Sequence, residues 1–154
     1  MRQDSKLSSV LHVLLHMAHI ERPLTSEELA GYLHTNAVLV RRVLAGLRTR
    51  GYVASDKGHG GGWSLVCDLQ KVTLRDIYEA VGAPTVFAMG NRNENPACLV
   101  EQAVNNALGD AFREAEQLLI SRLGDVTLAD LSADFSLRYA KHKHSKDVHE
   151  HHDL

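Results

Sequence analysis

The sequence predicts a mainly α-helical fold with one small β-hairpin, and three observations within residues 25–66 support this prediction. Apolar residues recur at helical spacing in two successive stretches, with a three-residue turn between them. A glycine follows the second stretch, as it does at many helix ends. Two short apolar runs then flank a glycine-rich tip, which is typical of a hairpin. This order predicts a winged helix-turn-helix, in which the hairpin is the wing.

The first helix of the pair is predicted to begin at Thr25 or Ser26. The Thr25 side-chain oxygen can accept from the free amides of the first turn, and Glu28 is placed as its capping-box partner. The inward residues lie at helical spacing: Leu29, Ala30 and Leu33. The turn over residues 34–36 ends in Asn36, which can cap the second helix.

The second helix has an apolar stripe that is predicted to face inward: Val38, Leu39, Val43, Leu44 and Leu47. Its basic residues fall largely off that stripe: Arg41, Arg42, Arg48 and Arg50. Gly51 is expected to end the helix. Residues 52–54 then form the first strand of the wing, residues 57–62 its tip, and residues 63–66 the second strand.

Further helices are predicted on both sides of residues 25–66, which we call the reading head. An opening helix carries an apolar stripe and should pack beneath the reading head: Leu7, Val10, Leu11, Leu14, Leu15 and Ala18. After the reading head, Thr73 caps a short helix whose inward residues are apolar: Leu74, Ile77, Tyr78 and Val81.

The rest of the chain is predicted to form a loop and two more helices. Residues 84–96 read as the loop, and a long helix follows over about residues 97–123, closed by Gly124. Thr127 then caps a last short helix that ends near Phe135.

We expect three parts in this chain of 154 residues, which is long enough for a real core. Residues 1–82 form the winged helix-turn-helix domain, residues 83–135 the loop and dimerisation helices, and residues 136–154 a charged, histidine-rich mobile tail. The net charge is −2, with +3 over residues 1–71 and −5 over the remainder. A moderately basic head on an acidic body favours a regulator that depends on two copies binding together over a general nucleic-acid coat.

The sequence predicts a cytoplasmic protein. No secretory signal precedes the opening helix, and no run approaches the ~20 apolar residues that cross a bilayer. Cys67 and Cys98 are the two cysteines, too few for a disulfide scaffold or a four-thiolate metal site. Reduced thiols and no membrane association are therefore expected.

The reading head predicts sequence-specific binding to double-stranded DNA. In such a fold the first helix crosses the phosphate backbone and the second enters the major groove. An arginine there can bond guanine bidentately or hold a phosphate, and helix-start amides can hold another phosphate. The wing glycines allow the backbone to approach DNA closely. The candidate DNA-binding residues lie at the two helix starts and in the wing: Thr25, Ser26, Thr35, Asn36, Val38, Arg41, Arg42, Lys57, His59, Gly60 and Gly61.

The long helix carries a nearly continuous apolar seam that mixes small and large side chains: Val100, Val104, Ala107, Leu108, Ala111, Ala115, Leu118 and Leu119. One reading head could not cover this seam, although packing wholly within its own subunit is the alternative. We expect a two-fold homodimer that places two reading heads on a palindrome. Six residues of the seam are assigned to the dimer interface: Val104, Leu108, Ala111, Ala115, Leu118 and Leu119.

Two other functional classes can be compared with DNA binding. A winged helix that has lost DNA binding can serve as a protein-interaction module, and the acidic total keeps this alternative open. An enzyme is disfavoured, because no Ser-His-Asp arrangement, phosphate loop or pair of catalytic acids is visible. No catalytic residue is assigned.

Several segments together carry a family resemblance: the wing sequence GHGGGW, VTLRDI over residues 72–77, Cys98-Leu99, and VTLADL over residues 126–131. With the start of the chain, they resemble the Rrf-type winged-helix transcription regulators, the group that contains IscR, NsrR and CymR. The similarity extends to about Tyr139 and is greatest to YwnA-like members without an iron-sulfur cluster. It implies a dimeric transcriptional regulator that acts as a repressor.

The chain also departs from that group. Cluster-binding members resemble one another in having three closely spaced cysteines before the dimer helix, and here only Cys98 matches, as the last of them. An iron-sulfur cluster is therefore not expected, and no cofactor or metal site is assigned. Arg41 stands where IscR-like members carry an acidic base-reading residue, so the operator should differ. Lys57 replaces a common wing arginine and loses the bidentate fork.

The signal that controls the regulator has several candidates. Cys98 could sense redox state, because a helix start can lower the pKa of a thiol. Cys98 and His12 could share a metal or cluster, since some relatives recruit a ligand from the partner's opening helix. A small-molecule pocket could lie beneath residues 84–96, lined by Phe87 and Met89. The tail histidines are treated as adventitious metal binders: His142, His144, His149, His151 and His152.

Overall fold

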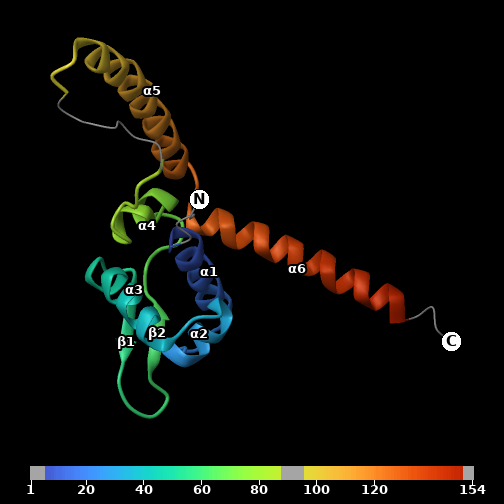
Figure 1. Cartoon of the computed structure of the whole chain (residues 1–154). Helices are drawn as coiled ribbons and strands as arrows, with labels where there is room; N and C mark the ends of the chain where they lie inside the picture. The colour runs from blue at the N-terminus through green and yellow to red at the C-terminus, as the bar shows by residue number, and fades with distance from the viewer. Residues whose placement is uncertain (1–5, 88–95, 151–154) are drawn as a thin grey trace.

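The computed structural model describes residues 6–87 and 96–150, with side chains described as far as residue 143 of the last helix. Along this part of the chain the elements follow in the order α1 (Lys6–His19), α2 (Ser26–Leu33), α3 (Ala37–Thr49), β1 (Val53–Asp56), β2 (Gly62–Leu65), α4 (Leu74–Ala80), α5 (Leu99–Gly124) and α6 (Leu128–Glu150). The predicted mainly α fold with a two-stranded wing is confirmed. Figure 1 shows the wing at one end of the molecule, while α5 and α6 extend away from the body in different directions.

The core lies where α1 packs among α2, α3, α4 and the wing. From α1 it takes Val10, Val13, Leu14 and Met17, all buried. The other elements contribute apolar side chains that are almost fully buried: Leu24, Leu29, Leu44, Leu47, Val53, Ile77 and Leu128. The predicted packing of the opening helix beneath the reading head is confirmed. Val13 and Met17 were not in the predicted stripe, in which Leu7, Leu11, Leu15 and Ala18 are half-buried.

The predicted inward stripe of α3 was wrong at two positions. Val38 and Leu39 are 63% and 45% exposed. The buried residues of α3 are Val40, Leu44 and Leu47, which lie four and three apart and so share one face of the helix. At 3.6 residues per turn, Val38 falls on the opposite side from that face. The exposure of Val38 agrees instead with its other predicted role, contact with DNA.

The wing is attached to the body through the chain before α2. Strands β1 and β2 are antiparallel, with Val53 opposite Leu65 and Asp56 opposite Gly62. The Trp63 amide donates to the Leu24 carbonyl at 2.8 Å, and the Leu24 amide donates back to Trp63 at 3.0 Å. Leu24 therefore extends the hairpin by one bridge and fixes where the wing leaves the core.

Gly62 permits this close approach between the wing and Leu24. Its φ is +150°, and a Cβ at this position would lie 2.7 Å from the Leu24 carbonyl oxygen. Gly62→Ala is therefore expected to lower the free energy of unfolding by about 1–3 kcal/mol, measured by chemical denaturation. Gly31→Ala is the control, because this α2 position has open space; it should raise stability by roughly 0.5–1 kcal/mol. Equal stability of Gly62→Ala and the unmodified chain would contradict the steric argument.

The starts of α4 and α6 are built alike and are joined to each other. Thr73 and Thr127 each donate through the backbone amide and the side-chain hydroxyl to the aspartate three residues on. The two threonines form an antiparallel bridge. On either side of it the Leu74 amide donates to Val126 and the Leu128 amide to Val72, both at 2.9 Å. Both predicted caps are confirmed, and their pairing ties the chain between α5 and α6 to the start of α4.

The last helix is much longer than predicted. It was expected to end near Phe135, and it continues to Glu150. After Leu128 no glycine or proline interrupts the chain before its end, and Asp134 and Arg138 form an i,i+4 ion pair at 2.6 Å. The mobility predicted for residues 136–154 remains a prediction, because side chains beyond residue 143 and all of residues 151–154 lie outside the described part.

Candidate nucleic-acid interface

The start of α2 is closed by a complete capping box, as predicted. The Glu28 amide donates to the Thr25 hydroxyl oxygen at 3.2 Å, and the Thr25 amide donates to the Glu28 carboxylate at 2.8 Å. Arg22 donates to both oxygens of that carboxylate, at 2.7 and 3.3 Å. Arg22 thereby neutralises Glu28, one of the two acidic side chains at the start of α2. This helix start was predicted to lie against a DNA phosphate.

The capping box should make part of the stability dependent on acid pH. The hydrogen bond from Arg22 and the Thr25 amide lower the pKa of Glu28 from 4.5 to about 2. Because the folded pKa is depressed, this stabilisation is complete above pH 4.5 and is lost as the pH falls towards 2. Glu28→Gln should lower the melting temperature at pH 7 and flatten its decline over that window. Glu21→Gln, which removes the same charge without removing a cap, should keep the decline; an unchanged acid profile in Glu28→Gln would contradict the prediction.

The Ser26 side chain is part of the core rather than the surface. It is buried, and its oxygen accepts from the Trp63 indole nitrogen at 2.9 Å. Only the backbone amide of Ser26 is therefore available to a ligand at the start of α2. The bond also joins α2 directly to β2, so that the helix start and the wing hold a constant relative position.

The start of α3 presents several of the predicted DNA-binding residues together. Asn36 caps the helix, its side-chain oxygen accepting from the Leu39 amide at 2.9 Å. Arg41 and Arg42 are exposed, as is Val38, whereas Thr35 is half-buried. Leu39 joins them as an exposed apolar residue that the sequence had placed inward. The surface thus offers guanidinium donors beside aliphatic groups, a mixture that suits base edges and thymine methyl groups.

Arg41 has a partner that the sequence did not indicate. Its guanidinium donates to the Glu27 carboxylate of α2 at 2.6 Å, with side-chain exposures of 53% and 66%. The two residues are fourteen positions apart, and only the angle between α2 and α3 brings them together. Arg41 therefore balances Glu27, the second acidic charge at the start of α2, and Glu27 determines where the Arg41 guanidinium lies in the free protein.

The tip of the wing is open and is shaped by glycine. Lys57 and His59 are exposed there, and Gly58 and Gly60 have φ values of +98° and +75°. The Gly61 amide donates to the Gly58 carbonyl at 3.1 Å and closes the turn. Behind the tip, Arg48 of α3 reaches the wing through the Ser55 hydroxyl at 3.1 Å and lies over the Trp63 ring at 5.9 Å.

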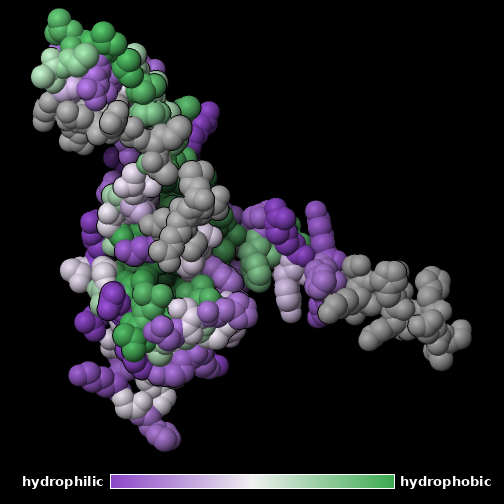
Figure 2. All heavy atoms as spheres, viewed as in Figure 1, coloured by the Kyte–Doolittle hydropathy of each residue, from purple (hydrophilic) through white to green (hydrophobic). Residues whose placement is uncertain are grey.

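The apolar seam lies on α5, outside the reading head. None of the residues of α5 is buried. Apart from Gly124 at its end, the half-buried residues of the helix share one face: Glu101, Asn105, Gly109, Phe112, Glu116, Ile120 and Leu123. The seam is centred roughly a third of a turn from that face. The large residues of the seam are 40–73% exposed: Val100, Val104, Leu108, Leu118 and Leu119. Figure 2 shows hydrophobic side chains gathered over the outer part of α5. Within the part of the chain that the structure describes, the seam is therefore largely uncovered.

The two cysteines lie in contrasting surroundings. Cys67 is half-buried against the core, and burial raises the pKa of its thiol. Cys98 is exposed at the N-cap of α5. Hydrogen bonds from the Glu101 and Val100 amides lower the pKa of the Cys98 thiol. The thiol that was predicted to be reactive thus has the greater thiolate fraction at neutral pH.

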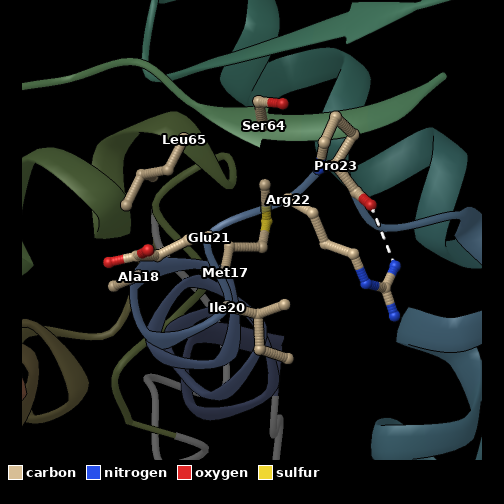
Figure 3. A pocket seen from close by; sticks show the side chains of 8 residues that line it. All are labelled: Met17, Ala18, Ile20, Glu21, Arg22, Pro23, Ser64 and Leu65. Atoms are coloured by element: carbon tan, nitrogen blue, oxygen red, sulfur yellow. Dashed lines mark hydrogen bonds between the residues drawn. The ribbon is translucent and has the colours of Figure 1, made fainter. Parts of the chain in front are cut away.

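A shallow hollow lies beside the wing. It has a volume of about 270 Å³, is open to solvent and lies between the end of α1 with the turn that follows it and β2 (Figure 3). Figure 3 shows the Arg22 guanidinium turned away from the hollow, towards the Pro23 carbonyl at 3.1 Å. The predicted pocket beneath the loop remains a prediction: Phe87 lies 6.1 Å from Phe112, ring to ring, and Met89 lies outside the described residues.

Comparison with known proteins places this chain in a family. A family model described as "Rrf2: Iron-dependent Transcriptional regulator" matches residues 3–134. YwnA of Bacillus subtilis (strain 168), provisionally named an HTH-type transcriptional regulator, is 28% identical over 83% of this chain and 95% of its own length. A Lactobacillus plantarum structure, provisionally described as a transcriptional regulator, is 28% identical, has a TM-score of 0.71, and covers 94% of this chain and 98% of its own.

The fold is also that of IscR from T. potens, with a TM-score of 0.63 at 18% identity over 87% of this chain and 88% of IscR. No helix in the described residues is long and apolar enough to cross a membrane.

The residues of this chain do not fit an iron-sulfur cluster held by cysteines. The whole sequence has two cysteines, and they lie on different elements: Cys67 after the wing and Cys98 at the start of α5. Figure 1 shows that the start of α5 is remote from α1, so Cys98 and His12 do not meet within one chain. In the described ranges, no group of three or more His, Cys, Asp and Glu side chains could hold a metal ion.

Proposed function

Because this chain belongs to the Rrf2 family of transcriptional regulators, we propose that it is a homodimeric repressor that binds a palindromic operator. The start of α3 enters the major groove, and the wing tip and the start of α2 contact the flanking phosphates. The observation that carries this proposal is the exposed surface of Asn36, Val38, Arg41 and Arg42, which lies on one helix start between the capped α2 and the wing. Repression is inferred from the family resemblance.

Each candidate contact has a physical role in this proposal. Arg41 and Arg42 supply guanidinium forks for guanine or phosphate, and Val38 supplies an aliphatic surface for a thymine methyl group. Lys57 and His59 donate to phosphates from the wing, where Gly60 and Gly61 keep the backbone close to DNA. At the start of α2 the Ser26 amide, beside Thr25, donates to a phosphate.

The Glu27–Arg41 pair supports a selective rather than a uniform affinity for DNA. A carboxylate near the DNA backbone repels phosphates, so Arg41 offsets the Glu27 charge while it remains paired. A guanine beside Arg41 would satisfy the remaining donors of the same guanidinium, which carries five N–H groups. On the correct operator Arg41 therefore stays paired with Glu27. A DNA sequence that draws Arg41 away leaves the Glu27 charge unpaired beside the phosphates.

The uncovered seam supports the homodimer. Its alternation of alanine with leucine and valine allows two α5 helices to pack closely around a two-fold axis. Two reading heads joined in this way would bind the two halves of a palindrome, with the second half-site bound at a high effective concentration.

A fluorescence-anisotropy titration tests the proposal. The purified protein is titrated against duplex DNA from just upstream of its own gene and against the same duplex with its palindrome scrambled. We expect tight binding that falls steeply with salt and is at least tenfold weaker for the scrambled duplex. Binding without sequence preference, or no binding to this DNA or to DNA selected from random pools, would favour the protein-interaction module instead.

We also propose that the regulator responds to thiol oxidation at Cys98, the lowered pKa of this exposed thiol being the supporting observation. Oxidation by diamide should weaken operator binding in the unmodified chain and leave binding by Cys98→Ser unchanged. Cys67→Ala is the matched control and should still respond, because its thiol is half-buried. Equal operator binding before and after oxidation would discard the thiol response and favour a small-molecule effector.

We propose further that the protein acts by binding, without catalytic activity and without an iron-sulfur cluster, and that it acts in the cytoplasm. The division into residues 1–82, 83–135 and 136–154 is retained, although α6 crosses its last boundary.

A further inference from the structure

Two histidines of α1 face each other on the outside of the reading head. His12 and His16 are one turn apart, and their Nε2 atoms lie 2.9 Å from each other. Their ring centroids are 4.8 Å apart, at an interplanar angle of 42°. Spacing of four residues places both side chains on the same helix face, which is the spacing that zinc-binding histidine pairs use on a helix.

The His16 ring is held in place by a second helix. It stacks on Tyr32 of α2 with 4.1 Å between ring centroids and an interplanar angle of 5°. Stacking occupies a face of the imidazole and leaves the Nε2 atom, at the ring edge, 2.9 Å from Nε2 of His12. His12 is exposed and can adjust its side chain. One member of the pair is thus pre-oriented, and the other is free to move by a few tenths of an ångström.

The separation of the two nitrogens suits a shared cation. A tetrahedral zinc ion with bonds of about 2.0–2.1 Å to two nitrogens places them about 3.3 Å apart. The observed 2.9 Å needs only a small widening. Without a cation, one ring must donate an N–H hydrogen bond to the other, which constrains both tautomers; a cation accepts the two lone pairs together.

We propose that His12 and His16 form a two-histidine binding site for a divalent transition-metal cation, with water in the remaining coordination positions. Imidazole nitrogen selects zinc, nickel and copper over magnesium and calcium, which prefer oxygen. The described residues offer no third metal-binding side chain at this place. Two protein ligands bind a metal ion more weakly than the four that a structural zinc site uses. The site is independent of DNA binding and of any cysteine-held cluster.

His19, on the next turn of α1, has other partners. Its ring packs against Phe135 of α6 at 4.5 Å between centroids, and its Nε2 lies 3.3 Å from the Ser132 hydroxyl oxygen. These contacts draw the His19 ring towards α6. His19 is therefore the natural control for a site that uses the two preceding histidines of the same helix.

The experiment uses the full chain with the five tail histidines replaced by glutamine, because the tail can collect metal by itself: His142, His144, His149, His151 and His152. Calorimetric titration with ZnCl₂ should show one Zn²⁺ per chain, and MgCl₂ should show no binding. His12→Gln and His16→Gln should each weaken zinc binding at least tenfold, whereas His19→Gln should change it less than twofold. Zinc should also raise the melting temperature of the parent and not that of His12→Gln, since it binds only the folded pair.

A second measurement covers the case in which a variant does not fold. Imidazole ¹⁵N resonances of the parent chain should shift on addition of Zn²⁺ for His12 and His16, and not for His19. Zinc affinity that is unchanged in both His12→Gln and His16→Gln, or zinc-induced shifts confined to other histidines, would overturn the proposal.

Discussion

Replacing Arg41 with alanine is expected to weaken binding to the operator by about ten- to a hundredfold, the equivalent of roughly 1–3 kcal/mol for one bidentate base contact. The loss should be largest for the duplex with the intact palindrome, because a guanine contact contributes only where the correct base is present. Anisotropy titrations against the intact and the scrambled duplex measure the two losses separately. We therefore expect the ratio of the two affinities, and not only the affinity itself, to fall.

Arg138→Ala is the matched control for this substitution. Arg138 is also exposed and also donates to a carboxylate at 2.6 Å, but it lies on α6. Its replacement removes the same charge and should change operator affinity less than twofold. If Arg41→Ala weakens both duplexes equally, Arg41 contacts a phosphate and reads no base. If it weakens neither, the proposed orientation of α3 on DNA is wrong.

A Glu27 variant, tested in the same assay, distinguishes a base contact by Arg41 from a phosphate contact. Glu27→Gln keeps the shape of the side chain but removes the charge that holds Arg41. Affinity for the scrambled duplex should then rise, because a repulsive carboxylate is gone, and discrimination should fall. This pattern would not arise if Glu27 only stabilised the free protein.

Replacing Leu108 with glutamate is expected to convert the dimer into a monomer and to weaken operator binding by about a hundredfold or more. Leu108 lies near the middle of the seam and is 43% exposed in the single chain. A two-fold interface brings the substituted position near its own copy, so two buried carboxylates would replace an apolar contact. Light scattering on a sizing column measures the oligomeric state, and anisotropy measures binding to the palindrome.

Asn106→Glu provides the matched control. Asn106 is exposed on the side of α5 opposite to Leu108 and receives the same charge. It should remain dimeric and bind the operator like the unmodified chain. A dimeric Leu108→Glu variant would show that the seam is covered by something other than a second α5. A monomer with undiminished operator affinity would show that one reading head suffices.

The features that could be predicted from the sequence are those with local causes. The caps at Thr25, Asn36 and Thr73 need only a side-chain oxygen and an amide two or three residues later, so they are visible in the order of residues. The wing likewise follows from a run of glycines between apolar residues. The end of α6 was misjudged because nothing local stops that helix, and a charged, histidine-rich tail was expected after Phe135.

The candidate interface was predicted less completely than the fold. Most of its residues were named from the helix starts and the wing tip, but Glu27 and Leu39 were missed. A run of apolar residues cannot show which of Val38, Leu39 and Val40 faces the core, because each of them lies at helical spacing from a different set of apolar residues. Only the packing of α3 into the assembled core selects Val40, which is buried.

The sequence by itself determined the order and type of the elements, their caps and the family, because helix spacing, capping and turn chemistry act over a few residues. The tertiary structure alone decided the contacts between distant residues: Glu27 with Arg41, Ser26 with Trp63, His16 with Tyr32, and Thr73 with Thr127. Each of these pairs depends on the angle at which two elements meet. That angle is determined by the packing of side chains across the whole core, and no short segment of the sequence specifies it.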